Sequence, residues 1–151
     1  MIHIRVPQLF RTSYPVGENI SNNLPLIQIM YEEIKKLHGV EGINLWCRGS
    51  SGAIIAAIIA KEYINSGGKA LICHVKKKGE HSHNGSLYFE HGSKDIIVDD
   101  FVSSGETVKA IWAKQQEVTE KRPCHCLVVS CNLPVEVSAY FADKLEVIIS
   151  N

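Results

Sequence analysis

Two neighbouring carboxylates, Asp99 and Asp100, follow a short apolar run and are the side chains best placed to do chemistry. A run of small residues comes next, and then a helical pattern with Val108, Ile111 and Trp112 on one face. The spacing predicts a strand, an acidic end, a tight loop and a helix. Carboxylates in such a place accept hydrogen bonds from hydroxyl groups or coordinate a metal ion.

The small-residue loop has the composition of an anion site. A loop of this kind that enters a helix presents backbone N–H groups to a phosphate, and the helix dipole helps. Together with the carboxylates it predicts a ligand that carries both a phosphate and a diol, which is a sugar phosphate. Two alternatives need no ligand: an Asp-Asp pair often forms a solvated turn, and Ser103 and Glu106 have the spacing of a capping box. The loop and the first helical residues are Ser103, Ser104, Gly105, Glu106 and Thr107.

A second loop of similar composition lies earlier in the chain, between an apolar strand pattern over 43–47 and a helical pattern over 53–64. Its glycines permit a close backbone approach, its serines add hydroxyl donors and its arginine adds charge. The alternative is a purely structural strand-to-helix turn. The loop consists of Arg48, Gly49, Ser50, Ser51 and Gly52.

A third polar loop, residues 76–86, contains three lysines and two histidines. Composition alone favours a solvated charged loop with no further role. Its residues of interest are Lys77, Lys78, His81 and His83.

The elements that position these loops alternate between strand and helix patterns. A strand-helix-strand crossover over 43–75 indicates a parallel sheet. A helix over 23–38, with Asn23 as its cap and Pro25 in its first turn, precedes it. We therefore predict one doubly wound α/β domain over 1–151, with a mainly parallel sheet and a short strand and loop over 1–23. Further strands are expected at 87–91, 95–98, 127–130 and 145–149, with helices from about 104 and over 134–143.

Composition excludes several classes of function. The formal net charge is zero, so no broad electrostatic attraction to nucleic acid or to an anionic membrane is expected. Five cysteines at irregular spacing favour a reducing compartment, and the absence of a secretory leader or a long apolar run favours the cytoplasm. Cys124, His125 and Cys126 invite a metal interpretation, but the spacing is not that of a zinc site.

The stretch Asp95-Ile-Ile-Val-Asp-Asp-Phe-Val-Ser-Ser-Gly-Glu-Thr107 closely resembles the signature of the type I phosphoribosyltransferases. Phe101 is bulkier than the usual aliphatic residue. The resemblance implies binding of phosphoribosyl pyrophosphate (PRPP) with Mg²⁺, and transfer of 5-phosphoribose to a nucleobase nitrogen with release of pyrophosphate. It implies that 103–107 hold the 5-phosphate. It also implies that Asp99 and Asp100 hold the ribose hydroxyls and contact the metal, directly or through water.

The other two loops extend the resemblance. Residues 48–52 fall where the family places its pyrophosphate loop. In the orotate enzymes a mobile loop carries Arg-Lys, then Lys, then His-Gly; Lys77-Lys78, His81 and His83-Asn84 fall at these places, with substitutions. The resemblance implies that Lys77, Lys78 and His83 neutralise or protonate the leaving pyrophosphate, and that a homodimer shares its sites.

The acceptor base is not defined by the sequence. Only 1–23 is available for the base-binding hood of the family, with Phe10, Arg11 and Tyr14 as its suggestive residues. The paired phenylalanines of the orotate enzymes and the C-terminal extension of the hypoxanthine enzymes are missing. An orotate-like or purine acceptor is expected. Two alternatives stay open: a non-catalytic regulator that binds PRPP or a nucleotide on the same fold, and a hydrolase of sugar phosphates.

Overall fold

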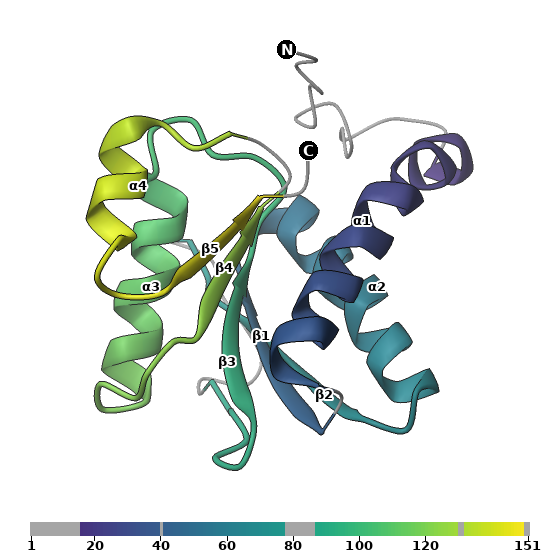
Figure 1. The fold of residues 1–151 in the computed structure, drawn as a ribbon, viewed down its shortest axis with the longest axis horizontal. Coiled ribbons are helices and arrows are strands. Elements are labelled where there is room, and N and C mark those ends of the chain that lie inside the picture. Colours follow the sequence, from purple (N-terminus) through teal and green to yellow (C-terminus); the bar gives the residue numbers. More distant parts are fainter. Residues whose placement is uncertain (1–15, 40, 78–86, 130–131, 150–151) are drawn as a thin grey trace.

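The computed structural model has three layers, with one sheet between two pairs of helices (Figure 1). It describes residues 16–39, 41–77, 87–129 and 132–149, without the side chains of 16–23 and 149. The elements in chain order are α1 (Val16–His38), β1 (Gly42–Cys47), α2 (Gly49–Asn65), β2 (Lys69–His74), β3 (Lys94–Val98), α3 (Glu106–Val118), β4 (Cys126–Val129), α4 (Val135–Phe141) and β5 (Glu146–Ile149).

All five strands run parallel, in the order β2-β1-β3-β4-β5. The chain steps from β1 outward to β2 and then returns across β1 to form β3. The strand order therefore reverses between β1 and β3, and ligands of open α/β sheets bind outside the carboxyl ends of the strands at such a point. The predicted doubly wound α/β fold is confirmed.

Each face of the sheet carries its own hydrophobic cluster. Ile43, Leu45 and Cys47 of β1 pack with α1 and α2, whereas Trp46 points to the face of α3 and α4. Because β1 is buried on both faces, its sequence reads as a nearly continuous apolar run rather than an alternating one. Among the helices of the described residues, no stretch is both long and apolar enough to cross a bilayer.

The first helix begins earlier than the sequence predicts. The structure begins α1 at Val16 and not near Asn23, so Pro25 lies inside the helix. Glycine and asparagines dominate 17–23 and hide the helical pattern there. Proline in a helix interior removes one hydrogen bond and favours a bend, and Figure 1 shows the first turns of α1 running in another direction from the rest.

The predicted strand over 87–91 is not formed. Residues 87–90 have no regular secondary structure and do not join the ladder of the sheet, and 91–93 form a turn. The Asn44 side chain takes the place of a strand partner: its Nδ2 donates to the Glu90 carbonyl (2.9 Å), and its Oδ1 accepts from the Glu90 amide (3.0 Å). A strand-like composition was therefore overridden by a side chain that satisfies the backbone groups.

Candidate functional site

The central strand β3 ends at Val98, so Asp99 and Asp100 stand at the carboxyl edge beside the point where the strand order reverses. Asp99 is only 4% exposed, and Asp100 is half-buried. Oδ1 of Asp99 accepts a hydrogen bond from the Asp100 amide at 2.9 Å. The backbone N–H of Asp99 donates to the Val128 carbonyl on β4, and this bond anchors the turn to the sheet.

The surroundings of Asp99 disfavour its charged form. Burial, and after it the neighbouring Asp100, raises the pKa of the Asp99 carboxyl from its ordinary value of 3.8 to about 8. The Asp100 amide and the charge of Lys77 act in the opposite direction. A carboxyl held in this state becomes a good ligand for a hydroxyl group or a cation once positive charge arrives.

The loop after Asp100 forms a small polar pocket. Asp99 and residues 101–105, with Thr107 and Val108 of α3, line a cavity of about 40 Å³. One water needs about 10–15 Å³ by this measure, so the cavity is suited to a group of a few heavy atoms, such as a phosphate. Gly105 caps α3 with a left-handed φ of 83°. The first-turn N–H groups of α3 are therefore beside the pocket.

The capping-box alternative for this loop is not formed. Gly105, and not Ser103, holds the cap position of α3, and no side-chain cap bond is made there. Ser104 Oγ accepts from the Glu106 amide at 3.4 Å, which is long for a hydrogen bond. The serines of this loop therefore do not start α3 through a capping box.

The predicted turn over 48–52 is mostly helix, which corrects the sequence interpretation. Arg48 is the extended cap residue of α2, and Gly49 to Gly52 form its first turn, with φ of 75° at Gly49. The glycines and serines disguised a helix start as a loop. The Arg48 Nε is buried and makes no hydrogen bond to any residue that the structure describes. An unpaired guanidinium nitrogen at a helix N-terminus is suited to an anion.

The two predicted phosphate-binding segments, 48–52 and 103–107, lie at the same edge of the sheet. A Cβ added to Gly52 would lie 3.9 Å from Oδ1 of Asp99, and one added to Gly49 would lie 3.9 Å from Nζ of Lys77. The structure thus brings together the start of α2, the first lysine of the polar loop and the acidic end of β3. Ser50 is exposed and Ser51 half-buried in the same first turn. Lys78, His81 and His83 lie outside the described residues, as do the strand over 2–6, Phe10, Arg11 and Tyr14.

The protein alone offers few metal ligands at this site. Within the described residues, no group of three or more His, Cys, Asp or Glu side chains is arranged to hold a metal ion. The Cys124, His125 and Cys126 segment is included in this result, and both thiols are buried. Asp99 and Asp100 fit Mg²⁺ only as two of its ligands, because Mg²⁺ usually keeps several waters and binds through one or two carboxylates together with substrate phosphates.

A buried polar network supports the site from the opposite end of β3, and the sequence analysis did not find it. Asp95 is fully buried and accepts from Asn44 Nδ2 (2.7 Å), Gln115 Nε2 (3.0 Å) and Arg122 Nε (2.9 Å). Arg122 also donates to the His91 carbonyl at 2.6 Å. The available signal was Asn44, a lone amide inside an apolar strand, because buried polar groups require partners.

Comparisons with known proteins find a similarity of fold but none of sequence. No protein-family model matches the chain, and no curated protein matches it by sequence. The crystal structure of the hypoxanthine-guanine phosphoribosyl transferase of L. donovani is similar in fold, with a TM-score of 0.51 and 12% identity. The match covers 87% of this chain and 75% of that one. The chain therefore has a fold like that of the type I phosphoribosyltransferases.

Proposed function

We propose that the protein is a phosphoribosyltransferase that transfers 5-phosphoribose from PRPP to a nucleobase nitrogen and releases pyrophosphate. One observation carries the proposal: two helix N-termini and an aspartate pair meet where the strand order of the sheet reverses. A ligand with an anion at each end and a diol between them fits this arrangement. The fold-level likeness to a purine enzyme supports the same class of reaction and leaves an orotate-like or purine acceptor open.

The position of each predicted site residue indicates its role in the proposed reaction. The pocket over 101–105, with Glu106 and Thr107 at the start of α3, holds the 5-phosphate by main-chain amides. Asp99 and Asp100 hold the ribose hydroxyls and stabilise positive charge that develops on the sugar. The first turn of α2, with Arg48, holds the departing pyrophosphate. Lys77 adds positive charge beside that turn, and Lys78 and His83 act from the same loop to neutralise or protonate the leaving group.

Mg²⁺ is the metal that this donor set fits. Asp99 and Asp100 would hold the ion directly or through water, and it would supply positive charge that stabilises the departing pyrophosphate. The raised pKa of Asp99 supports this assignment, because a nearby cation compensates for the buried charge.

The reaction is tested by measuring pyrophosphate release from PRPP and Mg²⁺ across a panel of nucleobases, orotate and hypoxanthine among them. The proposal predicts release that depends on one base and on Mg²⁺. A hydrolase of sugar phosphates would instead release phosphate or ribose 5-phosphate with no base present. Absence of release with every base would remove the transferase activity.

A second candidate is a regulator that binds PRPP or a nucleotide without catalysis. The observation that favours it is the burial of Asp99, whose oxygen is already occupied by the Asp100 amide. Such a regulator binds PRPP with no base-dependent release of pyrophosphate. The base panel together with a binding titration therefore separates the two candidates.

We also propose a cytoplasmic homodimer. The four cysteines that the structure describes are all free thiols, which supports a reducing compartment. Dimers that share sites are implied by the resemblance of the polar loop to that of the orotate enzymes.

A further inference from the structure

Helix α2 has more apolar surface than the described residues cover. One side of it, with Ile55, Ile59 and Tyr63, is buried against α1 and the sheet. Ile54 and Ile58 lie on another side and are only partly buried, and Ala57 between them is exposed. The sequence over 53–60 is apolar all round. A helix that is hydrophobic all round is normally covered all round, so the exposed side indicates a missing neighbour.

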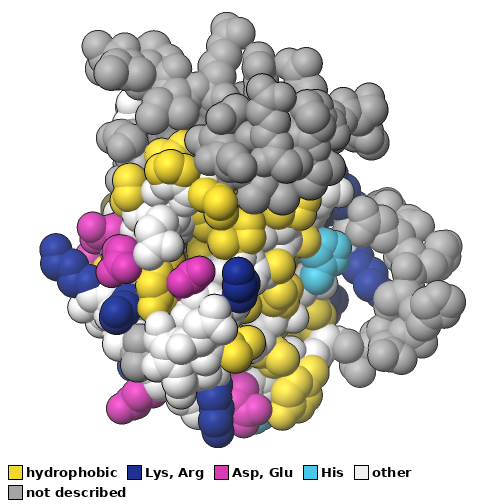
Figure 2. Space-filling view, turned by 90° about the vertical axis from the view of Figure 1, so that its right-hand side faces the viewer, with side chains coloured by type: hydrophobic (Ala, Val, Ile, Leu, Met, Phe, Trp, Pro, Cys, Tyr) yellow, Lys and Arg dark blue, Asp and Glu magenta, His cyan; other side chains and the backbone are white. Residues whose placement is uncertain are grey.

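That side of α2 forms one wall of a groove. The groove has a volume of about 810 Å³ and lies between α1 and α2, with Leu24 and Ile27 on the α1 wall and Ile54, Ala57 and Ile58 on the α2 wall. Leu24 is 41% exposed. Figure 2 looks at this side of the molecule, where hydrophobic side chains gather in the upper part of the described surface and charged side chains stand near its centre. Contiguous apolar surface of this kind marks an interaction site.

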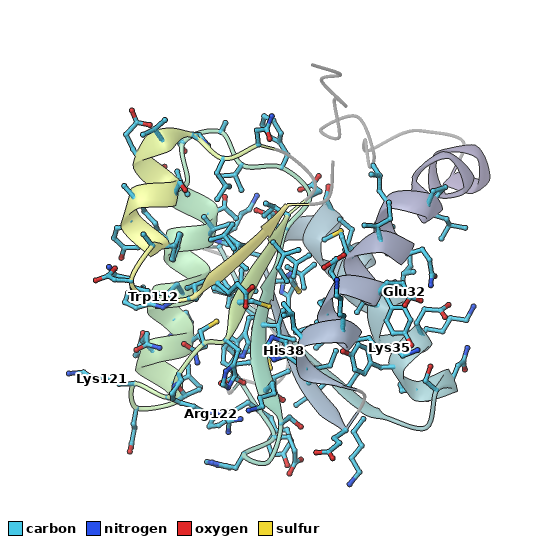
Figure 3. The ribbon with its side chains drawn as sticks, in the orientation of Figure 1. Glu32, Lys35, His38, Trp112, Lys121 and Arg122 are labelled. Carbon is cyan, nitrogen blue, oxygen red and sulfur yellow. The ribbon has the colours of Figure 1, made fainter. Side chains whose placement is uncertain are left out.

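The charges around the groove match a second copy of the same face. Lys61 and Glu62 are neighbours on α2, and both line the groove. Near the end of α1 two acidic residues, Glu32 and Glu33, are followed by two basic ones, Lys35 and Lys36, and Figure 3 shows Glu32 and Lys35 on the outer side of the helix. A two-fold axis places the same patch on both sides of an interface. An arrangement that sets Lys61 of one copy against Glu62 of the other would pair opposite charges, and the zero net charge of the chain does not oppose association.

The size of the face also suits a dimer. Helices of 23 and 17 residues are about 34 and 25 Å long at ~1.5 Å per residue. Packed side by side about 10 Å apart, they present a face of about 25 by 20 Å. Its accessible area is of the same order as the ~800 Å² that each partner contributes to a stable interface.

We propose that the groove between α1 and α2 is the self-association surface of the protein, closed by the same groove of a second copy in a two-fold four-helix arrangement. The proposal does not depend on the reaction, so either can fail without the other. It assigns the unmatched apolar side of α2 to the dimer and gives Lys61 and Glu62 the role of fixing the register between copies.

The first test is the mass of the full chain in solution, by light scattering or sedimentation. The expected mass is twice the 16.8 kDa of the chain. Ala57→Glu puts two charges into the centre of the interface, so this variant should be monomeric with an unchanged circular dichroism spectrum. Val135→Glu is the matched control, because Val135 is 80% exposed on α4, on the other side of the sheet. This variant should remain dimeric.

The second test reverses the charges of Lys61 and Glu62. Lys61→Glu alone and Glu62→Lys alone each set like charges against one another across the axis, and each should weaken the dimer at least about tenfold. A mixture of the two single variants should form a heterodimer, because every contact is then between opposite charges. This rescue cannot come from a change within one chain.

Two outcomes would overturn the proposal. The first is a monomer at all concentrations up to the solubility limit. The second is a dimer that Ala57→Glu leaves intact, since the interface would then lie elsewhere.

Discussion

Gly52 at the start of α2 approaches the carboxylate of Asp99 so closely that an added Cβ would lie 3.9 Å from Oδ1. The same Cβ would lie 3.6 Å from the Val98 carbonyl and 3.4 Å from the Cys47 Cβ. These are ordinary van der Waals distances, so the first turn of α2 packs directly against the end of the central strand. The two predicted phosphate-binding segments, 48–52 and 103–107, therefore both adjoin the carboxyl end of β3.

Gly105 is expected to be the most sensitive glycine of the site. Its φ is +83°, and an added Cβ would lie 2.4 Å from Cγ2 of Val137. Gly105→Ala should lower the free energy of unfolding by more than the ~1–2 kcal/mol of a left-handed alanine alone. Gly67→Ala is the matched control, since Gly67 has φ of +84° and nothing within 4 Å of its added Cβ. In urea titrations, equal losses for the two variants would show that Val137 is not in the way.

The carboxyl of Asp99 should destabilise the free protein at high pH. Its pKa is raised in the folded state to about 8, so the folded state holds the proton more tightly than the unfolded chain, whose carboxyl titrates near 3.8. Stability from this group is fully present at low pH and is lost as the pH rises toward 8. Asp99→Asn should therefore raise the free energy of unfolding at pH 8.5, by more than about 1 kcal/mol, and have little effect at pH 4. Glu136→Gln, on an exposed side chain, is the control and should change neither. A loss of stability at pH 8.5 would contradict the assigned environment.

The network around Asp95 should matter more than any surface ion pair. Arg122→Ala leaves a fully buried carboxylate without its cation and should lower the free energy of unfolding by about 3–5 kcal/mol. Figure 3 shows Arg122 below α3, next to exposed Lys121. Lys114→Ala removes an exposed ion pair to Glu117 and should change stability by less than about 1 kcal/mol. Thermal or urea unfolding of both variants measures the contrast, and similar losses would refute it.

Lys77 should contribute to pyrophosphate binding, because its ammonium lies beside the first turn of α2. Lys77→Ala should weaken pyrophosphate binding about tenfold, which corresponds to ~1.4 kcal/mol. Lys76→Ala is the natural control, because Lys76 is an exposed neighbour of the same charge. Calorimetric titration with pyrophosphate and Mg²⁺ gives both constants. Equal weakening in the two variants would indicate a general effect of charge and no specific contact.

Much of the fold follows from local patterns. The strands β1 to β5 and the helices α2 to α4 stand where apolar runs, glycines and prolines predict them, because parallel strands buried on both faces have few other compositions. The site segment from β3 to α3 was equally visible, since an apolar strand, a small-residue turn and a helical pattern follow one another directly in the chain.

The missed features depend on contacts between distant residues. Residues 87–90 have the composition of a strand, but Asn44 on β1 binds the Glu90 backbone and replaces the ladder. The meeting of Asn44, Asp95 and Arg122 joins three segments that no local window contains. The start of α2 at Gly49 was hidden because glycine and serine are typical of both loops and first helical turns.

The central claim is that the end of β3 and the start of α3 hold a ribose phosphate through acid side chains and main-chain amides. Isothermal titration of PRPP with Mg²⁺ into the wild-type protein and into the double variant Asp99→Asn/Asp100→Asn tests it most directly. The account predicts saturable binding by the wild type and at least about tenfold weaker binding by the variant, a change of ~1.4 kcal/mol or more. Equal binding by the two proteins, or no binding by the wild type, would contradict it.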